Sequence, residues 1–326
     1  MKPTAKQVAH EAGVSISAVS RAFSPGSSID PGKKQRILRV AAQLGYVSPA
    51  RRTAEVLSAG TVTLVAGDLA NPFYPLVLDT LAKALQAIGR QLLVYTIPPG
   101  TDMDQLTPQI LAARPNALVV TSASLTSGMA QACRQHGIRV VLLNRIQRDV
   151  RVNAVACDNH AGGRDAATFL IARERRRIGF IGGIADTSTH RDRIAGFRET
   201  LQEGGQAIFA ERSGGYTYRG GYTAAQAMLS GRQRPDALFC CNDIMALAAI
   251  DAAREMGLST PDDLSIIGFD DIPMAGWTSY RLTTIRQPIT RMINEVVGLI
   301  EAGATVPVDE TTTSILPGKL MIRGSA

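Results

Sequence analysis

The 326-residue sequence contains no run of apolar residues close to the roughly 18 that a membrane-spanning helix needs. Its first ten residues, MKPTAKQVAH, lack the apolar segment that forms the centre of a secretory signal peptide. Aromatic residues are sparse, at 5% of the chain, although the apolar fraction of 45% is ordinary for a globular protein. We therefore expect a cytoplasmic protein without a membrane span, long enough for two or three folded units.

Cysteine is also scarce, and its spacing does not suit a metal site or a disulfide framework. The four cysteines are Cys133, Cys157, Cys240 and Cys241, and no CxxC pair occurs. Adjacent side chains of a strand point to opposite faces, so Cys240 and Cys241 could not hold one metal ion. We expect four reduced thiols, no metal and no cofactor.

Motifs for common catalytic chemistry are missing too. The sequence has no HExxH metal motif, no GxSxG nucleophile turn and no phosphate-binding P-loop. The four histidines stand apart, and none falls with a serine and a carboxylate in a recognisable triad pattern. The segment GFIGG at residues 179–183 lacks the GxGxxG spacing of a dinucleotide-binding loop. We therefore expect a protein that is not an enzyme.

Positive charge, by contrast, is concentrated near the start of the chain. Residues 1–60 hold nine basic and three acidic side chains, which accounts for +6 of the total net charge of +7. Such asymmetry indicates an N-terminal unit with an anionic partner, nucleic acid before membrane. The alternative is a basic face that is simply solvated.

Residues 1–46 carry start and stop signals for three short helices. Thr4 and Gln7 form a capping box for the first helix, and Gly13 stops it. Ser15 is an N-cap for the second helix, and Asp30 is an N-cap for the third. Small apolar side chains and a glycine turn let short helices cross closely, so a small all-α helix-turn-helix unit is predicted.

The second of these helices has an outward face that needs a partner. Its alanines and valine form the inward face, which leaves Ile16, Ser17 and Arg21 pointing outward. In a helix-turn-helix, the start of the second helix enters the major groove of DNA. An arginine can pair with guanine, a serine can bond several bases, and an isoleucine can touch a thymine methyl group. The pattern favours DNA binding over a generic three-helix cap whose exposed isoleucine has no function.

The segments TAKQVAHEAGVSISAVSRAF and KQRILRVAAQLGY resemble the headpiece of the lac-repressor/galactose-repressor (LacI/GalR) family of bacterial transcription regulators. By this resemblance, Ile16 and Ser17 occupy the positions that select the operator, and Arg21 supports base readout. We expect a homodimer on a near-palindromic, double-stranded operator, because paired half-sites match two-fold symmetry. The implied DNA-contacting residues of the headpiece are Thr4, Ser15, Ile16, Ser17, Ser20, Arg21 and Lys33.

Residues 47–60, VSPARRTAEVLSAG, link the headpiece to the rest of the chain. In the family that it resembles, this linker forms a hinge helix on DNA and inserts a leucine into the minor groove, where an apolar wedge bends the duplex. Leu57 matches that leucine, but its distance from the GY pair exceeds the usual spacing, so the wedge is either Val56 or Leu57. Arg51 is expected to neutralise a phosphate. The alternative is a flexible linker whose apolar residues touch the next domain.

From residue 61 onward, short apolar runs typical of strands alternate with helical segments. That alternation predicts an α/β fold whose parallel sheets are covered by helices on both faces. Ligands of such sheets bind at the carboxyl ends of the strands. Those ends here carry polar residues, among them Asn71, Asn144, Asn242 and Asp270.

The segments DLANPFY, VACDNHAGG, TSTHRDRIAGF and IIGFDD resemble signatures of the same family's effector domain. The resemblance implies a periplasmic-binding-protein-like domain over residues 61–326, which dimerises and holds its ligand between two α/β lobes. We place lobe one at about 61–157 and 288–326, and lobe two at about 158–287.

A sugar site needs planar groups that bond pairs of hydroxyls and an aromatic ring that packs on the sugar. By resemblance, Arg193 is the strongest candidate, Asp270 would accept from hydroxyls, and Tyr216 would stack. Structural alternatives stay open: Asp270 could end a strand and cap a helix, Arg193 could be a surface residue, and Tyr216 could belong to the core. The implied ligand-binding residues are Asp68, Phe73, Asn144, Asp158, Arg193, Tyr216, Asn242, Asp270 and Gln287.

The sequence thus predicts a DNA-binding regulator of transcription whose operator affinity depends on a small sugar or sugar-acid ligand. Among regulators, the resemblance favours a repressor. The alternative is a sugar-binding protein or a sugar-acting enzyme without a function on DNA.

Overall fold

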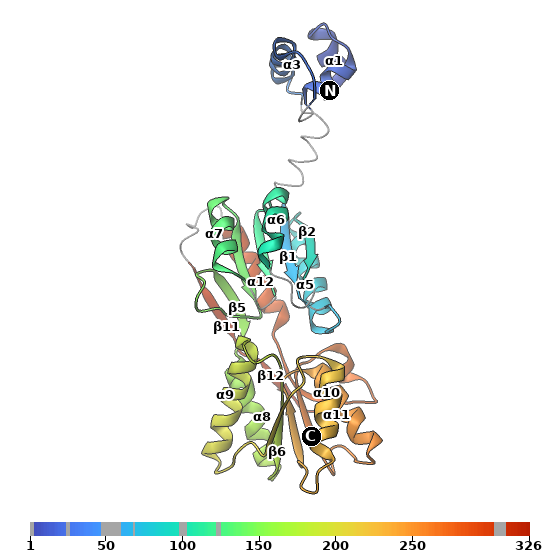
Figure 1. The fold of residues 1–326 in the computed structure, drawn as a ribbon, viewed down its shortest axis with the longest axis vertical. Coiled ribbons are helices and arrows are strands. Elements are labelled where there is room, and N and C mark those ends of the chain that lie inside the picture. Colours follow the sequence, from blue (N-terminus) through green and yellow to red (C-terminus); the bar gives the residue numbers. More distant parts are fainter. Residues whose placement is uncertain are drawn as a thin grey trace. The chain divides into compact units, whose positions relative to one another are not determined.

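Figure 1 shows the computed structural model, which describes residues 3–23, 27–46, 60–67, 69–97, 103–121, 125–302 and 311–326. The chain divides into two compact units, Met1–Thr61 and Val62–Ala326, and each is described by itself below. Three expected DNA-contacting residues, Arg51, Val56 and Leu57, and the expected ligand residue Asp68 lie outside the described residues.

The described part of the first unit consists of the helices α1 (Ala5–Glu11), α2 (Ile16–Ala22) and α3 (Pro31–Gln43). The capping box forms, since Thr4 N donates to Gln7 Oε1 at 2.8 Å and Thr4 Oγ1 accepts from Gln7 N at 3.3 Å. Gly13 follows α1 with a φ of +60°, a conformation that costs glycine little and other residues more. These local features set the sharp turn into α2.

Side-chain caps and a small apolar core complete the headpiece. Ser15 Oγ accepts from Ala18 N at 3.2 Å, and Asp30 Oδ1 accepts from Lys33 N at 2.8 Å. The rings of Phe23 and Tyr46 meet edge to face at 5.8 Å between centroids. The buried core residues are Val8, Ala9, Ala12, Ala18, Val19, Ala22, Ile37, Ala41 and Tyr46.

The second unit holds two six-stranded sheets in its described residues, and the first, sheet A, has the strand order β11-β5-β4-β3-β1-β2. Its strands are β1 (Thr61–Ala66), β2 (Gln91–Thr96), β3 (Ala117–Val120), β4 (Arg139–Leu143), β5 (Asn153–Cys157) and β11 (Thr313–Leu316). Neighbours from β11 to β1 pair in parallel. The accompanying helices are η1 (Met103–Leu106), α5 (Phe73–Ala87), α6 (Thr107–Ala113), α7 (Ser127–Gln135) and α12 (Ile289–Glu301). Sheet A with these helices is called lobe one.

Sheet B has the order β12-β10-β9-β8-β6-β7 and defines lobe two. Its strands are β6 (Ile178–Gly182), β7 (Ala210–Ser213), β8 (Ala237–Cys240), β9 (Ser265–Asp270), β10 (Thr283–Arg286) and β12 (Lys319–Met321). All its pairs are parallel except β10–β12, which is antiparallel. In Figure 1, α8 (Asn159–Ala172) and α9 (Ser188–Glu203) lie on one side of the sheet, and α10 (Tyr218–Leu229) and α11 (Asp243–Glu255) on the other. A short helix, η2 (Pro273–Gly276), follows β9.

The chain passes between the lobes three times within the described residues: between β5 and α8, between β10 and α12, and between β11 and β12. The expectation that all of residues 288–326 belong to lobe one is therefore wrong for the C-terminal strand. Leu320 of β12 pairs with Ile285 of β10 in sheet B. Gly318 lies close to neighbouring groups at this return, since a Cβ there would lie 3.2 Å from the Arg286 carbonyl oxygen.

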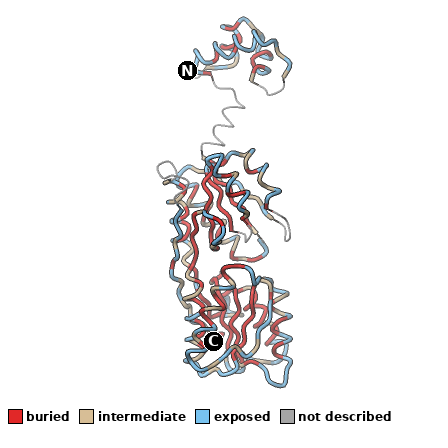
Figure 2. Tube along the Cα trace, turned by 60° about the vertical axis from the view of Figure 1, so that its left-hand side comes forward, coloured by how far each residue is buried: buried red, intermediate tan, exposed pale blue. Residues whose placement is uncertain are grey.

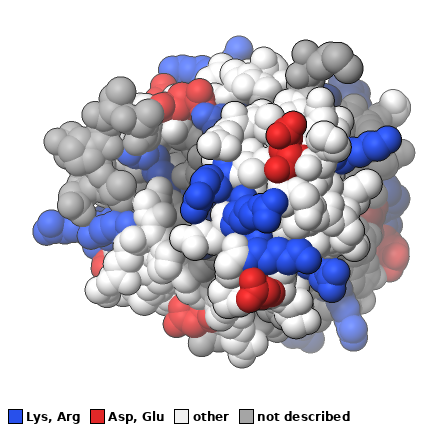
Figure 3. Space-filling model, turned by 90° about the horizontal axis from the view of Figure 1, so that it is seen from above, with Lys and Arg blue, Asp and Glu red and all other residues white. Residues whose placement is uncertain are grey.

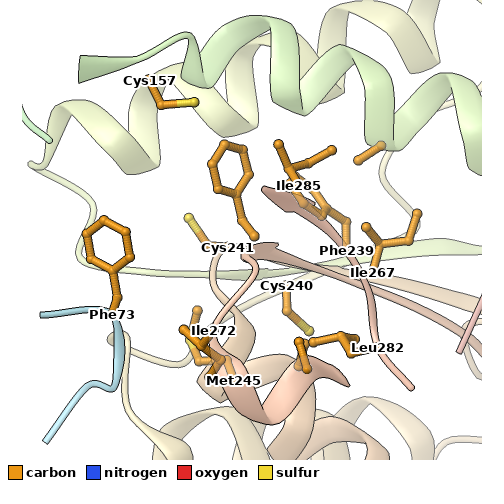
Figure 4. Packing of buried hydrophobic residues seen from close by; sticks show 14 of the residues in the cluster. Phe73, Cys157, Phe239, Cys240, Cys241, Met245, Ile267, Ile272, Leu282 and Ile285 are labelled. Carbon is orange, nitrogen blue, oxygen red and sulfur yellow. The ribbon is translucent and has the colours of Figure 1, made fainter. Parts of the chain in front are cut away.

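The central strands of each sheet are buried on both faces, whereas the edge strands β2, β7, β11 and β12 are partly exposed (Figure 2). In lobe two, the ring of Phe239 on β8 lies 4.8 Å from that of Phe197 on α9. The next residue, Cys240, points to the opposite face, where Leu282 and Met245 lie (Figure 4). All four cysteines are free and buried, and burial raises the pKa of each thiol, so none is a reactive thiolate.

None of the helices in the described ranges is long and apolar enough to cross a membrane.

Candidate functional site

The first candidate surface is the outward face of α2. Ile16 is 53% exposed, although its neighbours Ala18 and Val19 on the same helix are buried. Ser17 Oγ lies 2.9 Å from Ser15 Oγ, and Arg21 Nε donates to the Ser17 carbonyl oxygen at 3.3 Å. The side chains expected to read base edges therefore lie on one exposed helix face, held close to their backbone.

The described headpiece carries several exposed positive charges. The basic side chains of the described headpiece are all exposed: Lys6, Arg21, Lys33, Lys34, Arg36 and Arg39. Figure 3 shows Lys and Arg side chains gathered side by side near the centre of the view from above. A surface of this kind attracts the phosphate backbone of a nucleic acid regardless of its sequence.

The second candidate site is a pocket between the lobes, at the carboxyl ends of the strands. Its free volume is only about 20 Å³, so its own side chains nearly fill it. It is lined by Asn71, Phe73, Tyr74, Asn144, Arg145, Thr189, Arg193, Tyr216, Asn242 and Asp270. Six of these were expected to be ligand residues. The sequence placed Asn71 and Arg145 at strand ends without assigning them to the ligand, and Tyr74 and Thr189 were not assigned to it either.

Arg193 of α9 lies at the base of this pocket and is 2% exposed. Its Nε donates to Asn159 Oδ1 at 2.8 Å, and its Nη1 donates to the Cys241 carbonyl oxygen. Its guanidinium also stacks on the Phe269 ring, with Cζ 3.5 Å from the ring centroid. Arg193 is therefore not a surface arginine, and its fork is held rigidly by lobe two.

Asp270, the last residue of β9, faces the same guanidinium. Its Oδ1 lies 3.5 Å from Arg193 Nη2 and accepts from Gln287 Nε2 at 2.8 Å. Burial raises the pKa of this carboxyl, whereas the neighbouring Arg193 charge and the bond from Gln287 lower it. Its backbone has a φ of 122°, which is uncommon outside glycine.

Tyr216 contributes a hydroxyl as well as a ring. Its hydroxyl lies 2.9 Å from Thr189 Oγ1 and 3.3 Å from Thr187 Oγ1. Its ring covers Gly183, where a Cβ would lie 2.1 Å from the tyrosine Cζ. The phenol is thus tied to α9, with one ring face packed on backbone.

Several polar atoms at the pocket are buried without a hydrogen-bond partner in the described chain. In residues that line the pocket they are Asn144 Oδ1, Asn242 Nδ2 and the Arg145 atoms Nε and Nη1, and beside it Gln287 Oε1, which belongs to the residue bonded to Asp270 and not to the lining itself. Buried polar groups are normally paired, so a set of unpaired donors and acceptors around one pocket indicates a polar ligand.

Two further expected residues differ in their position relative to the pocket. Asp158 accepts from Ala161 N at 2.9 Å and caps α8, and it does not line the pocket. Phe73 lines the pocket from the first turn of α5 and is buried, with its ring 5.6 Å from that of Tyr74. Figure 4 shows Phe73 on the ribbon of lobe one, to the left of Cys241.

A larger cleft of about 680 Å³ also lies between the lobes and shares Arg145 with the narrow pocket. Its lining comes from the segment after β4 and from the start of α9: Arg145, Ile146, Gln147, Arg148, Asp149, Asp186, Thr187, Ser188, Arg191, Asp192 and Ala195, with Ile315 from β11. Within the described residues, no group of three or more His, Cys, Asp or Glu side chains could hold a metal ion.

A helix-turn-helix unit with a basic exposed face, followed by a two-lobed α/β domain with a polar pocket, is the arrangement of a DNA-binding protein with a separate domain that can hold a small molecule. Family models match both parts: bacterial regulatory proteins of the lacI family over residues 4–48, and a periplasmic binding protein-like domain over residues 167–326. The chain is 33% identical to a helix-turn-helix-type regulator in the aml 5′ region of Streptomyces limosus, covering 99% of this chain and 94% of that protein. It is 31% identical to the regulator MalR of Streptomyces coelicolor, covering 98% and 95%.

Solved structures give the same result. The complex of the transcriptional regulator CelR with cellobiose is 29% identical, with a TM-score of 0.74 and coverage of 99% of this chain and 100% of that one. A lac repressor dimer bound to operator, at 23% identity, shares the fold with a TM-score of 0.74 over 100% and 99% of the two chains. The chain belongs to the LacI family of bacterial regulatory proteins and is a DNA-binding regulator of transcription.

Proposed function

We propose that the chain binds a near-palindromic operator as a homodimer, and that a sugar-like ligand held between its lobes changes its affinity for that operator. The observation that carries this proposal is the pocket in which Arg193 and Asp270 of lobe two meet Asn144 of lobe one. A ligand that bonds both lobes has a different affinity for each lobe arrangement, which is what couples binding to conformation.

The DNA half of the proposal rests on α2. Ile16, Ser17 and Arg21 would meet base edges, while Ser20 and Lys33 would meet phosphates. The side-chain oxygens of Thr4 and Ser15 cap α1 and α2. Their proposed role is to hold the first turns of these helices in place where the helices meet the DNA. One headpiece reads few bases, so two copies on paired half-sites supply the specificity.

The ligand half rests on the chemistry of the unpaired atoms. Asn242 Nδ2 is a donor, whereas Asn144 Oδ1 and Gln287 Oε1 are acceptors. Sugar hydroxyls donate and accept at once, so they suit such a mixed set. The cellobiose complex of the 29% identical CelR supports a sugar-like ligand.

Free volume of about 20 Å³ is too little for a sugar, so ligand entry requires side chains or lobes to move. Arg193 moves with lobe two as one body, because α8 and α9 pack through glycines. A Cβ at Gly163 would lie 2.2 Å from the Arg193 carbonyl oxygen, and one at Gly196 would lie 2.0 Å from that of His160. A ligand that pulls on Arg193 therefore acts on the whole lobe.

The test is an electrophoretic mobility shift with DNA from upstream of the protein's own gene, with and without a panel of sugars and sugar acids. We expect one retarded complex, whose midpoint shifts when one compound is present. The same panel in a thermal-shift assay should raise the melting temperature with that compound only. Binding that is equally tight on random DNA of the same length would contradict the proposal.

We also propose that the chain catalyses no reaction and acts in the cytoplasm, where an operator is accessible. The buried charges of the pocket, Arg193 and Asp270, engage each other and lobe-two groups rather than a poised nucleophile. Turnover of any panel sugar by purified protein would overturn this part alone.

A further inference from the structure

Arg145 is the one pocket arginine whose charge the described structure leaves without a carboxylate partner. It directly follows Asn144 at the carboxyl end of β4 and is 8% exposed. Its Nε and Nη1 atoms are buried and have no hydrogen-bond partner in the described chain. Its Nη2 donates one long hydrogen bond, of 3.5 Å, to the uncharged Tyr74 hydroxyl.

The other charges nearby do not compensate it. Arg193 and Asp270 form a pair with each other at 3.5 Å, and Asp271 is held by Arg286 and Arg323. The acidic residues of the larger cleft, Asp149, Asp186 and Asp192, are exposed or partly exposed, and among the described residues none makes an ion pair with Arg145. Water screens charges at such positions, while a buried guanidinium without a counter-charge is costly.

We infer that the ligand carries an anionic group, a carboxylate or a phosphate ester, and that Arg145 binds it and thereby sets specificity. This rests on the proposed function and narrows its ligand class to acidic sugars. The guanidinium fork matches the planar carboxylate and the phosphate oxygens, and charge-assisted bonds of this kind are short and strong. The uncharged amides of Asn144 and Asn242 remain for the hydroxyls of the same molecule.

The location of Arg145 supports this arrangement. It lines both the narrow pocket and the larger cleft, so an anion on it would sit where the two meet. A ligand could then place its hydroxyls toward Arg193 in lobe two while its acid group stays on lobe one. The acid group would then bind lobe one, and the hydroxyls would bind Asn144 in lobe one and Asn242 and Arg193 in lobe two, so that the charged contact selects the ligand and the hydroxyls connect it to lobe two.

The test compares neutral sugars with their acidic counterparts in thermal-shift and calorimetric titrations. The probes are D-glucose, D-galactose and D-ribose, each beside its aldonic acid and its terminal phosphate ester, and glucose and galactose also beside their uronic acids. We expect at least one acid or ester to stabilise the wild-type protein more than its neutral parent. Comparing the sugar acids with the sugar phosphates then decides whether the anionic group of the ligand is a carboxylate or a phosphate ester.

Variants then assign the effect to Arg145. Arg145→Gln should lower affinity for the active anionic probe about 10- to 100-fold, the worth of a charged hydrogen bond, and leave neutral probes within about threefold. Arg145→Lys keeps the positive charge but lacks the guanidinium fork, so its affinity for the anionic probe should lie between those of the wild-type protein and Arg145→Gln. Arg198→Gln removes the same charge from the exposed partner of Glu211, outside both pockets, and should change nothing.

The inference is overturned if no anionic probe exceeds its neutral parent, or if Arg145→Gln keeps the full anionic shift. Retained operator binding by ligand-free Arg145→Gln separates this result from the proposed function. If the wild-type protein binds no operator but still prefers anions through Arg145, the proposed function fails and the ligand class stands.

Discussion

The replacement Arg193→Ala should destabilise lobe two as well as remove a ligand contact. It would leave Asp270 as a buried carboxylate without its counter-ion, and Asn159 Oδ1 and the Cys241 carbonyl oxygen without their donor. Removing one partner of a buried ion pair costs about 3–5 kcal/mol. In a domain of this size, 1 kcal/mol corresponds to roughly 2–4 °C, so the melting temperature should fall by about 6–20 °C.

The assay is differential scanning calorimetry of the full chain at pH 7, with Arg198→Ala as the control on the same helix. Arg198 makes an exposed pair with Glu211 at 3.1 Å, and such pairs are worth about 0–1 kcal/mol. At roughly 2–4 °C per kcal/mol, the melting temperature of the control should therefore lie within about 4 °C of that of the wild-type protein.

A double replacement tests the stated cause. Adding Asp270→Asn to Arg193→Met removes the uncompensated charge, so the double variant should be more stable than the single variant Arg193→Met. Losses that simply add, or a melting temperature for Arg193→Ala equal to that of the control, would refute the reasoning. Arg193 would then be no more than a contact of the ligand.

Three further predictions concern other parts of the chain. Arg21→Ala should relax one operator position at a cost of about 1–3 kcal/mol, measured by competition between operator variants; equal losses on random DNA would count against base readout. Ser15→Ala removes the bond to Ala18 N and should lower headpiece stability by about 0.5–2 kcal/mol in circular-dichroism melts of the full chain, and Ser15→Asp should restore it. Burial raises the pKa of Asp243 from its ordinary value near 4 to about 8, so the folded state binds this proton more tightly than the unfolded state does. Stability should therefore fall as pH rises from about 4 to 8, more steeply in the wild-type protein than in Asp243→Asn, and parallel pH profiles would disprove this.

Local features of the headpiece could be predicted from the sequence because short-range chemistry fixes them. The Thr4 box, the Ser15 and Asp30 caps and the Gly13 turn all depend on residues within three positions of one another. The alternation of strands and helices likewise predicted parallel sheets. Since parallel strands place their carboxyl ends at one edge, the positions of Asn144, Asn242 and Asp270 followed from the pattern and from the family resemblance.

Features that depend on long-range pairing could not be predicted in this way. Nothing in residues 317–326 indicates that β12 leaves lobe one, since a three-residue strand has no pattern of its own and is fixed by β10. Arg145 reads in sequence as one more arginine after a strand, and only its burial beside unpaired groups distinguishes it. Asp158, like Asp270, is an acidic residue that follows the end of a strand or ends one. Its side chain accepts from Ala161 N, however, and therefore caps α8 instead of lining the pocket.

The three connections between the lobes also limit how the molecule can respond to damage or to mutation. A single backbone cut at one of the three described connections, such as Pro317–Gly318, would leave the two lobes covalently linked by the other two. The same redundancy restricts the paths of motion, because every rotation must be tolerated at Asp158, at Gln287 and at Gly318 together. Substitutions that stiffen any one of these points should therefore restrict the change between lobe arrangements and weaken the coupling between ligand binding and operator binding.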